Sequence, residues 1–455
     1  MIVTLPICKR PLTANHQLTS KVHRRGLSSR HGGLVVVKKR VLLLMPPTES
    51  HAAMAQPSDK QSLWILATLS ALMAFASIST DLYLPAMPAM ARSLHATNGQ
   101  LELTISGYLI GFSLGQLFWG PIGDRYGRRL PVALGLLMFI AGSAGCALST
   151  TAPMIIGWRA VQAVGACASV VLARAMIRDL YEGHRAAQML STLMTVMAIA
   201  PLLGPSIGGL ILRLGSWNLI FWGLAIFGLG TLVALYTLPE TLPYERRNHA
   251  PLSSSFRRYG QLLADRRVLG YASAGGFFYG GMYAYIAGTP FVYMDYYHVS
   301  AQTYGILFGV GIVGIMLANQ LNAKLVKEVG SDRLMRLGTT MAGLSGLCLA
   351  IDAWSDIGGL AGLVAPLFMF VAAAGLIVAN SIVGALNSFP QMAGSVSALI
   401  GSLQYGTGIL GSGLVGLMAD GTPRPMATVV ALFAAASMAC ALWVVKTRPE
   451  ADSQI

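Results

Sequence analysis

Long apolar runs alternate with short polar gaps along the chain after residue 62. A helix that crosses a bilayer needs roughly 20 mostly apolar residues, and the runs have about this length. The pattern predicts twelve such helices, near residues 63–83, 101–119, 131–149, 153–174, 188–212, 219–238, 269–290, 303–323, 334–352, 358–380, 393–418 and 426–445. The shorter alternating segments of a transmembrane β-barrel are not seen.

The longest internal gap, residues 239–268, is polar and basic and divides the helices six and six. Two six-helix halves joined by a linker favour parallel repeats around a central cavity. We therefore predict an all-α membrane protein with an N-terminal bundle at 63–238, a cytoplasmic linker at 239–268 and a C-terminal bundle at 269–446.

Composition agrees with this interpretation and explains the net charge of +14. Hydrophobic residues make up 54% of the chain and charged residues 11%, whereas a soluble domain is about 25% charged. The basic residues gather in alternate gaps, and the other gaps contain only Arg92, Arg213 and Arg424. Because basic loops stay on the cytoplasmic side, both termini are predicted to be cytoplasmic. The charge is thus a topology signal and not a nucleic-acid patch.

The two ends of the chain show no spanning pattern. In residues 1–62 the apolar pieces "LVVV" and "VLLLM" are too short to cross a membrane, and no convincing signal-peptide core is present. We expect a disordered cytoplasmic tail, or a start assigned too early with the real one at Met54. Residues 447–455 are expected to form a second cytoplasmic tail.

Several kinds of chemistry are disfavoured by the sequence. No GxxxxGK[ST] stretch occurs, so no ATP site of the P-loop type is expected. The eight histidines lie in the tail or in loops, and the five cysteines are mostly in apolar helices, so neither a metal site nor a disulfide is predicted. No catalytic residues stand out. We expect a protein that is not an enzyme, needs no cofactor and draws its energy from an ion gradient.

The stretch "GPIGDRYGRR" (120–129) concentrates charge between the second and third predicted helices. Pro121 should end the second helix, and Gly127 should allow a tight reversal. An acidic residue among arginines suggests an intramolecular latch, and a carboxylate can also bind a helix N-terminus. The predicted latch consists of Gly120, Asp124, Arg125, Gly127 and Arg128. The alternative is ordinary positive charge on the cytoplasmic side.

This loop resembles the signature loop of the major facilitator superfamily. "IIGWRAVQAVGACA" (155–168) resembles the superfamily's helix-4 motif with its buried arginine, although Ala163 stands where glycine is usual. "GPSIGG" (204–209) is similar to the antiporter motif that marks exporters. Further stretches resemble the Bcr/CflA drug-resistance transporters, the bicyclomycin-resistance type of drug:H⁺ antiporter. They are "STDLYLPAMP" (79–88), "RAMIRDLY" (174–181), "PFVYMDYYHVS" (290–300) and "FPQMAGSVSAL" (389–399).

The resemblance implies the major facilitator fold and a monomeric exporter in the bacterial inner membrane. Its substrates would be drugs similar to bicyclomycin or chloramphenicol, moved by alternating access against protons. It further implies that Gly204, Pro205, Gly208 and Gly209 limit proton leak. The alternative is a superfamily member that transports a metabolite such as an amino acid or a sugar.

Two charges within predicted helices are the candidates for proton coupling. Asp81 and Arg159 both fall in the outer half of the N-terminal bundle, and charges in a membrane usually pair and face a cavity. Movement of Arg159 relative to Asp81 would switch the carboxylate between charged and neutral forms. The alternatives are a helix-capping role for Asp81 and backbone pairing for Arg159. Glu102 is expected to lie at the membrane interface, and Arg174 to reach the cytoplasmic surface.

Small and aromatic residues suggest helix packing and a drug cavity. Gly107, Gly111 and Gly115 recur every four residues, which favours close helix approach. A broad apolar cavity with a few polar groups suits varied drugs. The candidate cavity residues are Tyr108, Phe112, Tyr279, Tyr283 and Tyr405. For each of them, simple packing between helices is the alternative.

Overall fold

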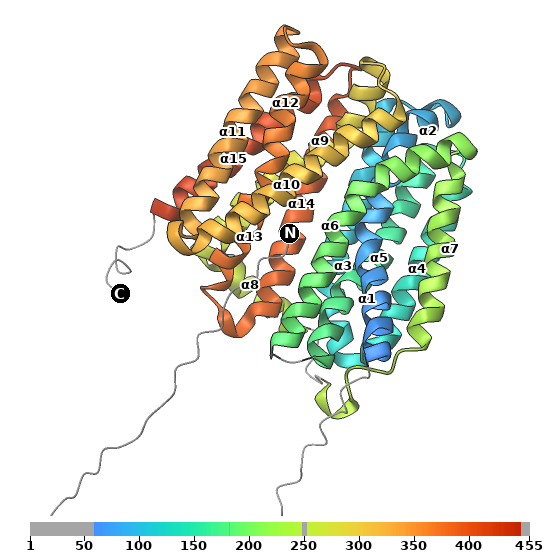
Figure 1. Ribbon diagram of the computed structural model, residues 1–455, viewed down its shortest axis with the longest axis vertical. Helices are drawn as coiled ribbons and strands as arrows, with labels where there is room; N and C mark the ends of the chain where they lie inside the picture. The colour runs from blue at the N-terminus through green and yellow to red at the C-terminus, as the bar shows by residue number, and fades with distance from the viewer. Residues whose placement is uncertain (1–58, 182, 248–252, 447–455) are drawn as a thin grey trace, which may run out of the picture. The chain divides into compact units, whose positions relative to one another are not determined.

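Helices form all of the regular structure in the part of the chain that the computed structural model describes, residues 59–181, 183–247 and 253–446 (Figure 1). This agrees with a chain whose backbone polar groups have no water to bind within a bilayer, and the predicted fold class is confirmed. The tail predictions for residues 1–58 and 447–455 lie outside the described residues.

The N-terminal half contains six long helices and one short one. A 3₁₀ turn at Leu84–Ala86 joins the first helix to the short one. The helices are α1 (Asp59–Asp81), α2 (Met87–Ser93), α3 (Asn98–Tyr126), α4 (Arg129–Ala147), α5 (Ala152–Leu180), α6 (Gly183–Leu214) and α7 (Asn218–Tyr236).

The C-terminal half follows the linker helix α8 (Ser253–Ala264). Its tenth predicted helix is divided at Ala373 into two pieces, and the second extends six residues beyond the predicted end at 380. The helices are α9 (Arg266–Phe291), α10 (Ala301–Val329), α11 (Ser331–Ser355), α12 (Gly359–Ala372), α13 (Ala374–Leu386), α14 (Ala393–Met418) and α15 (Arg424–Lys446).

Ten segments of the described residues are long and apolar enough to cross a membrane. Helices α9 and α14, with 26 residues each, are long enough but contain more glycine, serine and tyrosine. They pack against each other, and α14 also packs along α3 of the other half. With these two helices, the twelve predicted spans are all present.

Pro121 does not end a helix, contrary to the sequence-based expectation. Helix α3 continues through Pro121 to Tyr126. Proline removes the N–H that would bond to the carbonyl four residues earlier, which here belongs to Leu117. The hydroxyl of Tyr259 on α8 donates to this carbonyl at 3.4 Å. The linker helix thereby satisfies the acceptor that Pro121 leaves free.

The glycines of α3 pack as their spacing predicts. A Cβ atom at Gly107 or Gly111 would collide with a carbonyl oxygen of α5, and one at Gly115 would collide with Cys167. The three positions therefore let α3 and α5 approach at backbone distance, and the prediction of a close helix contact is confirmed.

The two halves meet closely at the end opposite to the linker. The backbones of Gly99 on α3 and Gly416 on α14 leave no room for side chains. The hydroxyls of Ser106 and Ser412 share a hydrogen bond of 2.8 Å. We call the other end, which carries the 120–129 loop and α8, the linker end.

Candidate functional site

Arg128 is the centre of a charge cluster at the linker end. Its Nε donates to Oδ2 of Asp179 at 2.8 Å, and its Nη1 donates to Oδ1 of Asp124 at 2.7 Å. The side chain of Arg128 is buried. Burial opposes its charge, but the bonds to Asp179 and Asp124 outweigh that cost, so the pKa of the guanidinium is raised.

A second carboxylate, Glu240, ties the linker to the start of α4. It accepts the backbone N–H groups of Arg128 at 2.8 Å and Arg129 at 3.1 Å. Free N–H groups at a helix N-terminus attract negative charge. The carboxylate at this helix N-terminus is therefore Glu240 and not Asp124, the acidic residue of the 120–129 loop. It lies against Gly127, whose φ of 91° is accessible mainly to glycine.

The structure brings together only part of the predicted latch. Asp124, Gly127 and Arg128 belong to the cluster, whereas Arg125 stacks on the neighbouring Tyr126. Gly120 faces open space at the cavity wall, because a Cβ there would meet nothing within 4 Å. Every partner of Arg128 comes from the N-terminal half or the start of the linker, so the cluster braces one half internally.

Two members of the cluster, Asp179 and Glu240, were missed by the sequence analysis. Asp179 occurs in "RAMIRDLY", and Glu240 lies at the start of the predicted linker, residues 239–268. Acidic residues at the cytoplasmic ends of helices, opposite a basic loop, were the available signal.

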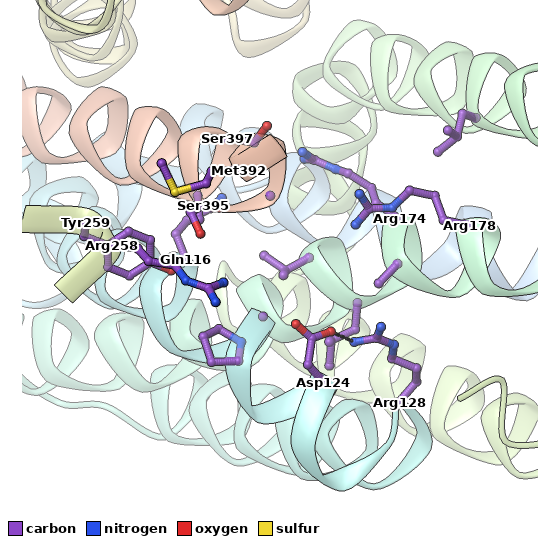
Figure 2. A pocket seen from close by; sticks show the side chains of 18 of the residues that line it. Gln116, Asp124, Arg128, Arg174, Arg178, Arg258, Tyr259, Met392, Ser395 and Ser397 are labelled. Atoms are coloured by element: carbon purple, nitrogen blue, oxygen red, sulfur yellow. Dashed lines mark hydrogen bonds and ion pairs between the residues drawn. The ribbon is translucent and has the colours of Figure 1, made fainter. Parts of the chain in front are cut away.

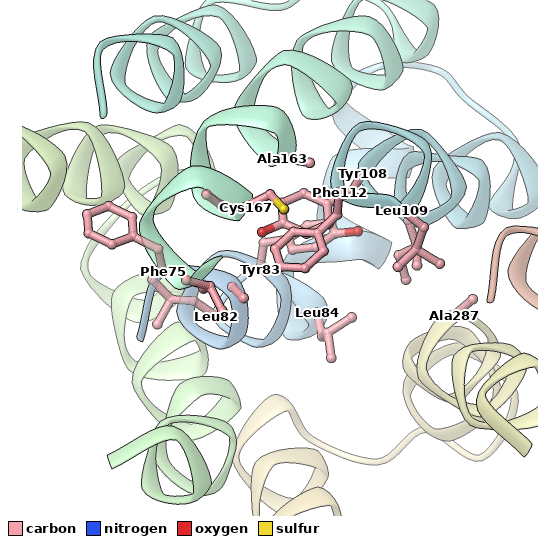
Figure 3. Packing of buried hydrophobic residues seen from close by; sticks show 14 of the residues in the cluster. Phe75, Leu82, Tyr83, Leu84, Tyr108, Leu109, Phe112, Ala163, Cys167 and Ala287 are labelled. Atoms are coloured by element: carbon pink, nitrogen blue, oxygen red, sulfur yellow. The ribbon is translucent and has the colours of Figure 1, made fainter. Parts of the chain in front are cut away.

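Arg159 on α5 is completely buried. Its Nη1 donates to the carbonyl of Ser79 at 2.8 Å and to Oε1 of Gln162 at 2.6 Å. Its guanidinium carbon lies 4.3 Å from the ring centres of both Tyr83 and Tyr108. Aromatic faces attract cations, most strongly where water is excluded. Figure 3 shows Tyr83 and Tyr108 among the buried residues of this half.

Asp81 ends α1, two residues after the carbonyl that Arg159 binds, and is buried. No ion pair within 4.0 Å joins it to Arg159 among the described residues. Instead, the backbone of α6 lies against it: a Cβ at Gly204 would be 2.9 Å from Cβ of Asp81. Asp81 and Arg159 are thus connected through the backbone of α1 and are not directly paired in this conformation.

The "GPSIGG" stretch lies between the two halves. Gly208 packs against the carbonyl of Leu82 after α1, and Gly209 faces Ala301 at the start of α10. Pro205 is within α6, together with Pro201, which the sequence analysis did not single out. This stretch therefore forms both one wall around Asp81 and part of the contact with the other half.

The five aromatic candidates form one continuous group of rings. Tyr108 and Phe112 are 6.0 Å apart, and Phe112 lies 4.5 Å from Tyr405 of the other half. Tyr405 is 6.0 Å from both Tyr279 and Tyr283. Since Tyr108 also stacks on Arg159, the rings connect the buried cation to the interface between the halves.

Glu102 is not interfacial, contrary to expectation. It is only 4% exposed, and its Oε2 has no hydrogen-bond partner within residues 59–181, 183–247 and 253–446. It lies on α3 beside Gly288, Val415 and Met426 of the C-terminal half. The sequence placed it near a helix end, but the close approach of the two halves at that end covers it.

A cavity of about 530 Å³ opens at the linker end (Figure 2). Helices α3, α5, α6, α8 and α14 line it, and Asp124 is part of its wall. Arg174, expected to reach the surface, also lines this cavity. The halves are therefore separated at the linker end and closed at the other.

The sequence pattern of the Major Facilitator Superfamily matches residues 68–412. The chain belongs to this superfamily. An uncharacterized MFS-type transporter, YdgK, from Bacillus subtilis is 35% identical over 82% of this chain and 93% of its own. A bicyclomycin resistance protein homolog from Haemophilus influenzae is 32% identical over 81% of this chain and 92% of its own.

Solved structures agree on the fold of this superfamily member. The xylose transporter XylE from E. coli, in a partially occluded inward-open conformation, superposes with a TM-score of 0.67 at 17% identity. The match covers 87% of this chain and 99% of that one. The predictions of a major facilitator fold, of resemblance to the bicyclomycin-resistance type and of a multi-pass membrane transporter that is not an enzyme are confirmed.

Gly127→Ala should destabilise the protein by about 1–3 kcal/mol, because it forces a side chain into a strained backbone region. The new Cβ would also lie 2.7 Å from Oε2 of Glu240. The measurement is the temperature at which the detergent-solubilised protein loses its monodisperse chromatographic peak. Gly120→Ala, in the same motif but with open space around it, is the matched control and should be tolerated. An equal decrease in this temperature for both variants would contradict the assigned role of Gly127.

Asp179→Asn and Asp124→Asn should differ in the same measurement. The side chain of Asp179 is 16% exposed and that of Asp124 is 51% exposed. Removing the charge of a buried partner costs about 3 kcal/mol, whereas an exposed pair contributes about 1 kcal/mol or less. We expect Asp179→Asn to lower the transition temperature clearly more than Asp124→Asn does. The reverse order would show that the exposed pair is the stronger one.

Proposed function

We propose that this chain is a proton-coupled efflux transporter that exports small-molecule drugs from the cytoplasm by alternating access. It would lie in the bacterial cytoplasmic membrane as a monomer with both termini inside. Support comes from the names of its relatives, which include a chloramphenicol resistance protein from Pseudomonas aeruginosa and multidrug resistance protein D from E. coli, each 28% identical. The observation that carries the mechanism is a buried carboxylate, Asp81, held without an ion pair against the glycines of α6.

The arrangement of the halves defines one state of the transport cycle. With the linker end placed in the cytoplasm, the cavity is open inward, and the Gly99–Gly416 and Ser106–Ser412 contacts close the outer side. Export requires these contacts to separate and the linker end to close. A drug bound between the halves is then released outward.

Asp81 is well placed to couple that movement to protons. A charged carboxylate within a membrane costs on the order of 3 kcal/mol or more unless it is paired. Asp81 would therefore be the neutral acid while it is buried away from water. It would lose its proton when α1 and α6 move and water reaches it. Arg159 binds the carbonyl of Ser79, two residues before Asp81 on α1. A movement of α1 that follows the loss of the proton would therefore act on Arg159.

The aromatic group provides the surface for the drug. Phe112 and Tyr405 come from opposite halves, and their ring centres lie 4.5 Å apart. Their separation would expose apolar faces with phenolic hydroxyls, a combination that accepts varied drugs.

Asp81→Asn should abolish export driven by a pH gradient, because the amide mimics the permanently neutral acid. The protein should still insert and bind a neutral drug. Glu102→Gln is the comparison, since it also removes a buried carboxylate of the N-terminal half but lies away from α6. It should keep coupled export. The measurement is chloramphenicol flux with simultaneous proton flux in proteoliposomes at matched protein levels.

The opposite result, with coupled export retained by Asp81→Asn and lost in Glu102→Gln, would move the proton site to Glu102. Flux of a sugar or an amino acid, with no flux of any drug by the unmodified chain, would overturn drug export itself.

Arg159→Lys should reduce the transport rate about tenfold or more. An ammonium group lacks the planar fork, so it cannot keep both hydrogen bonds and both stacked rings. Loss of a desolvated cation–π contact costs about 2 kcal/mol. Arg213→Lys, at an exposed position near the end of α6, is the control and should transport normally. Full transport activity of Arg159→Lys would show that only the positive charge at this position is required, and not the guanidinium group.

A further inference from the structure

Three arginines around the linker-end cavity have no acidic partner among the described residues. Arg174 and Arg178 on α5 and Arg258 on α8 all line the cavity, and none forms an ion pair with a described residue. The acidic residue in the same wall, Asp124, already binds Arg128. The cavity wall therefore carries an excess of positive charge that no described residue neutralises through an ion pair.

One of these arginines has an unsatisfied buried atom. The Nε of Arg174 is inaccessible to solvent and has no hydrogen-bond partner in the part of the chain that the structure describes. A buried donor left unpaired is costly, and more so when it carries charge. Figure 2 shows the Arg174 and Arg258 side chains reaching into the space from opposite sides. A negatively charged group in this space would be attracted by both guanidinium groups.

The position of Arg258 is fixed by the linker helix. Its neighbour Tyr259 is buried and donates its hydroxyl to the Leu117 carbonyl that Pro121 leaves free. This bond holds α8 on α3 and places Arg258 at the cavity wall. The linker helix is therefore a structural part of the cavity and not merely a connection between the halves.

The remaining walls determine what else an occupant must be. Leu172, Leu190, Met194 and Met392 provide apolar surface, and Gln116 and Ser395 provide polar groups. A volume of about 530 Å³ falls in the range of drug-sized sites. The walls suit a molecule with an apolar body and one anionic end.

We propose that this cavity is an entry site for organic anions, compounds with a carboxylate on an apolar body that are bound before export. Arg174 and Arg258 hold the carboxylate through charge-assisted hydrogen bonds, and the apolar wall holds the body. This rests on the proposed drug-export function and specifies one substrate class for it. The head group of an acidic phospholipid has the same chemistry, so the experiment must distinguish the two sources.

The test uses the full chain in nanodiscs of phosphatidylcholine with two probes of the same body, 1-naphthaleneacetate and its neutral amide. We expect the anion to bind at least tenfold more tightly than the amide. Arg174→Gln and Arg258→Gln should each weaken binding of the anion about fivefold or more, the effect of losing roughly one charge contact. Binding of the amide should not change. Arg257→Gln is the matched control, because Arg257 is exposed on the same helix and does not line the cavity.

Transport assays separate the possible failures. In inverted membrane vesicles the anion should be taken up, and Arg174→Gln should lose this uptake while keeping uptake of neutral chloramphenicol. Equal binding of both probes by the unmodified chain would overturn the proposal, as would equal weakening of both by Arg174→Gln. Competition by phosphatidylglycerol nanodiscs without any uptake of the anion would assign the site to lipid and also overturn it. Failure of all drug uptake would instead refute the proposed function.

Discussion

A guanidinium group buried completely among the helices is the constraint on which the N-terminal half depends. Arg159 binds α1 through the Ser79 carbonyl and stacks on Tyr108 of α3. Through Gln162 and the hydroxyl of Ser143 it also reaches α4. Because lipid supplies no hydrogen bonds, each of these helices must keep its position for the charge to remain solvated by protein. One side chain thereby fixes the relative placement of four helices.

The same constraint makes the outer part of this half sensitive to the charge of Asp81. Nε and Nη2 of Arg159 have no hydrogen-bond partner among the described residues, so hydrogen bonds stabilise only part of the guanidinium charge. Asp81 lies two residues beyond the bound carbonyl, and α6 packs directly on it. A change in the charge of Asp81 therefore acts on α1 and α6 together. Since α6 also contacts the start of α10, the effect extends to the interface between the halves.

The sequence predicted the number and type of helices and most of the residues that form the sites, but not their partners. Apolar runs are a local property, and the glycines at 107, 111 and 115 report a contact face by spacing alone. Helix ends were less predictable. Helix α3 continues through Pro121 because the Tyr259 hydroxyl, from a distant segment, donates to the carbonyl that the proline leaves free. The burial of Glu102 likewise depends on the other half of the chain. Partners such as Asp179 and Glu240 required the tertiary arrangement.

The low hydropathy of α9 and α14 follows from their position. Both pack mainly against other helices, so lipid does not dictate their composition. Their glycines and hydroxyls form an interface of many weak contacts, such as the Ser106–Ser412 and Ser113–Ser402 hydrogen bonds. A neutral hydrogen bond contributes only about 1 kcal/mol, because water replaces it when it opens. An interface of this kind can close completely and still separate, which the same area of interlocked leucine side chains would oppose. The two helices least like membrane spans by composition are therefore the ones suited to alternating access.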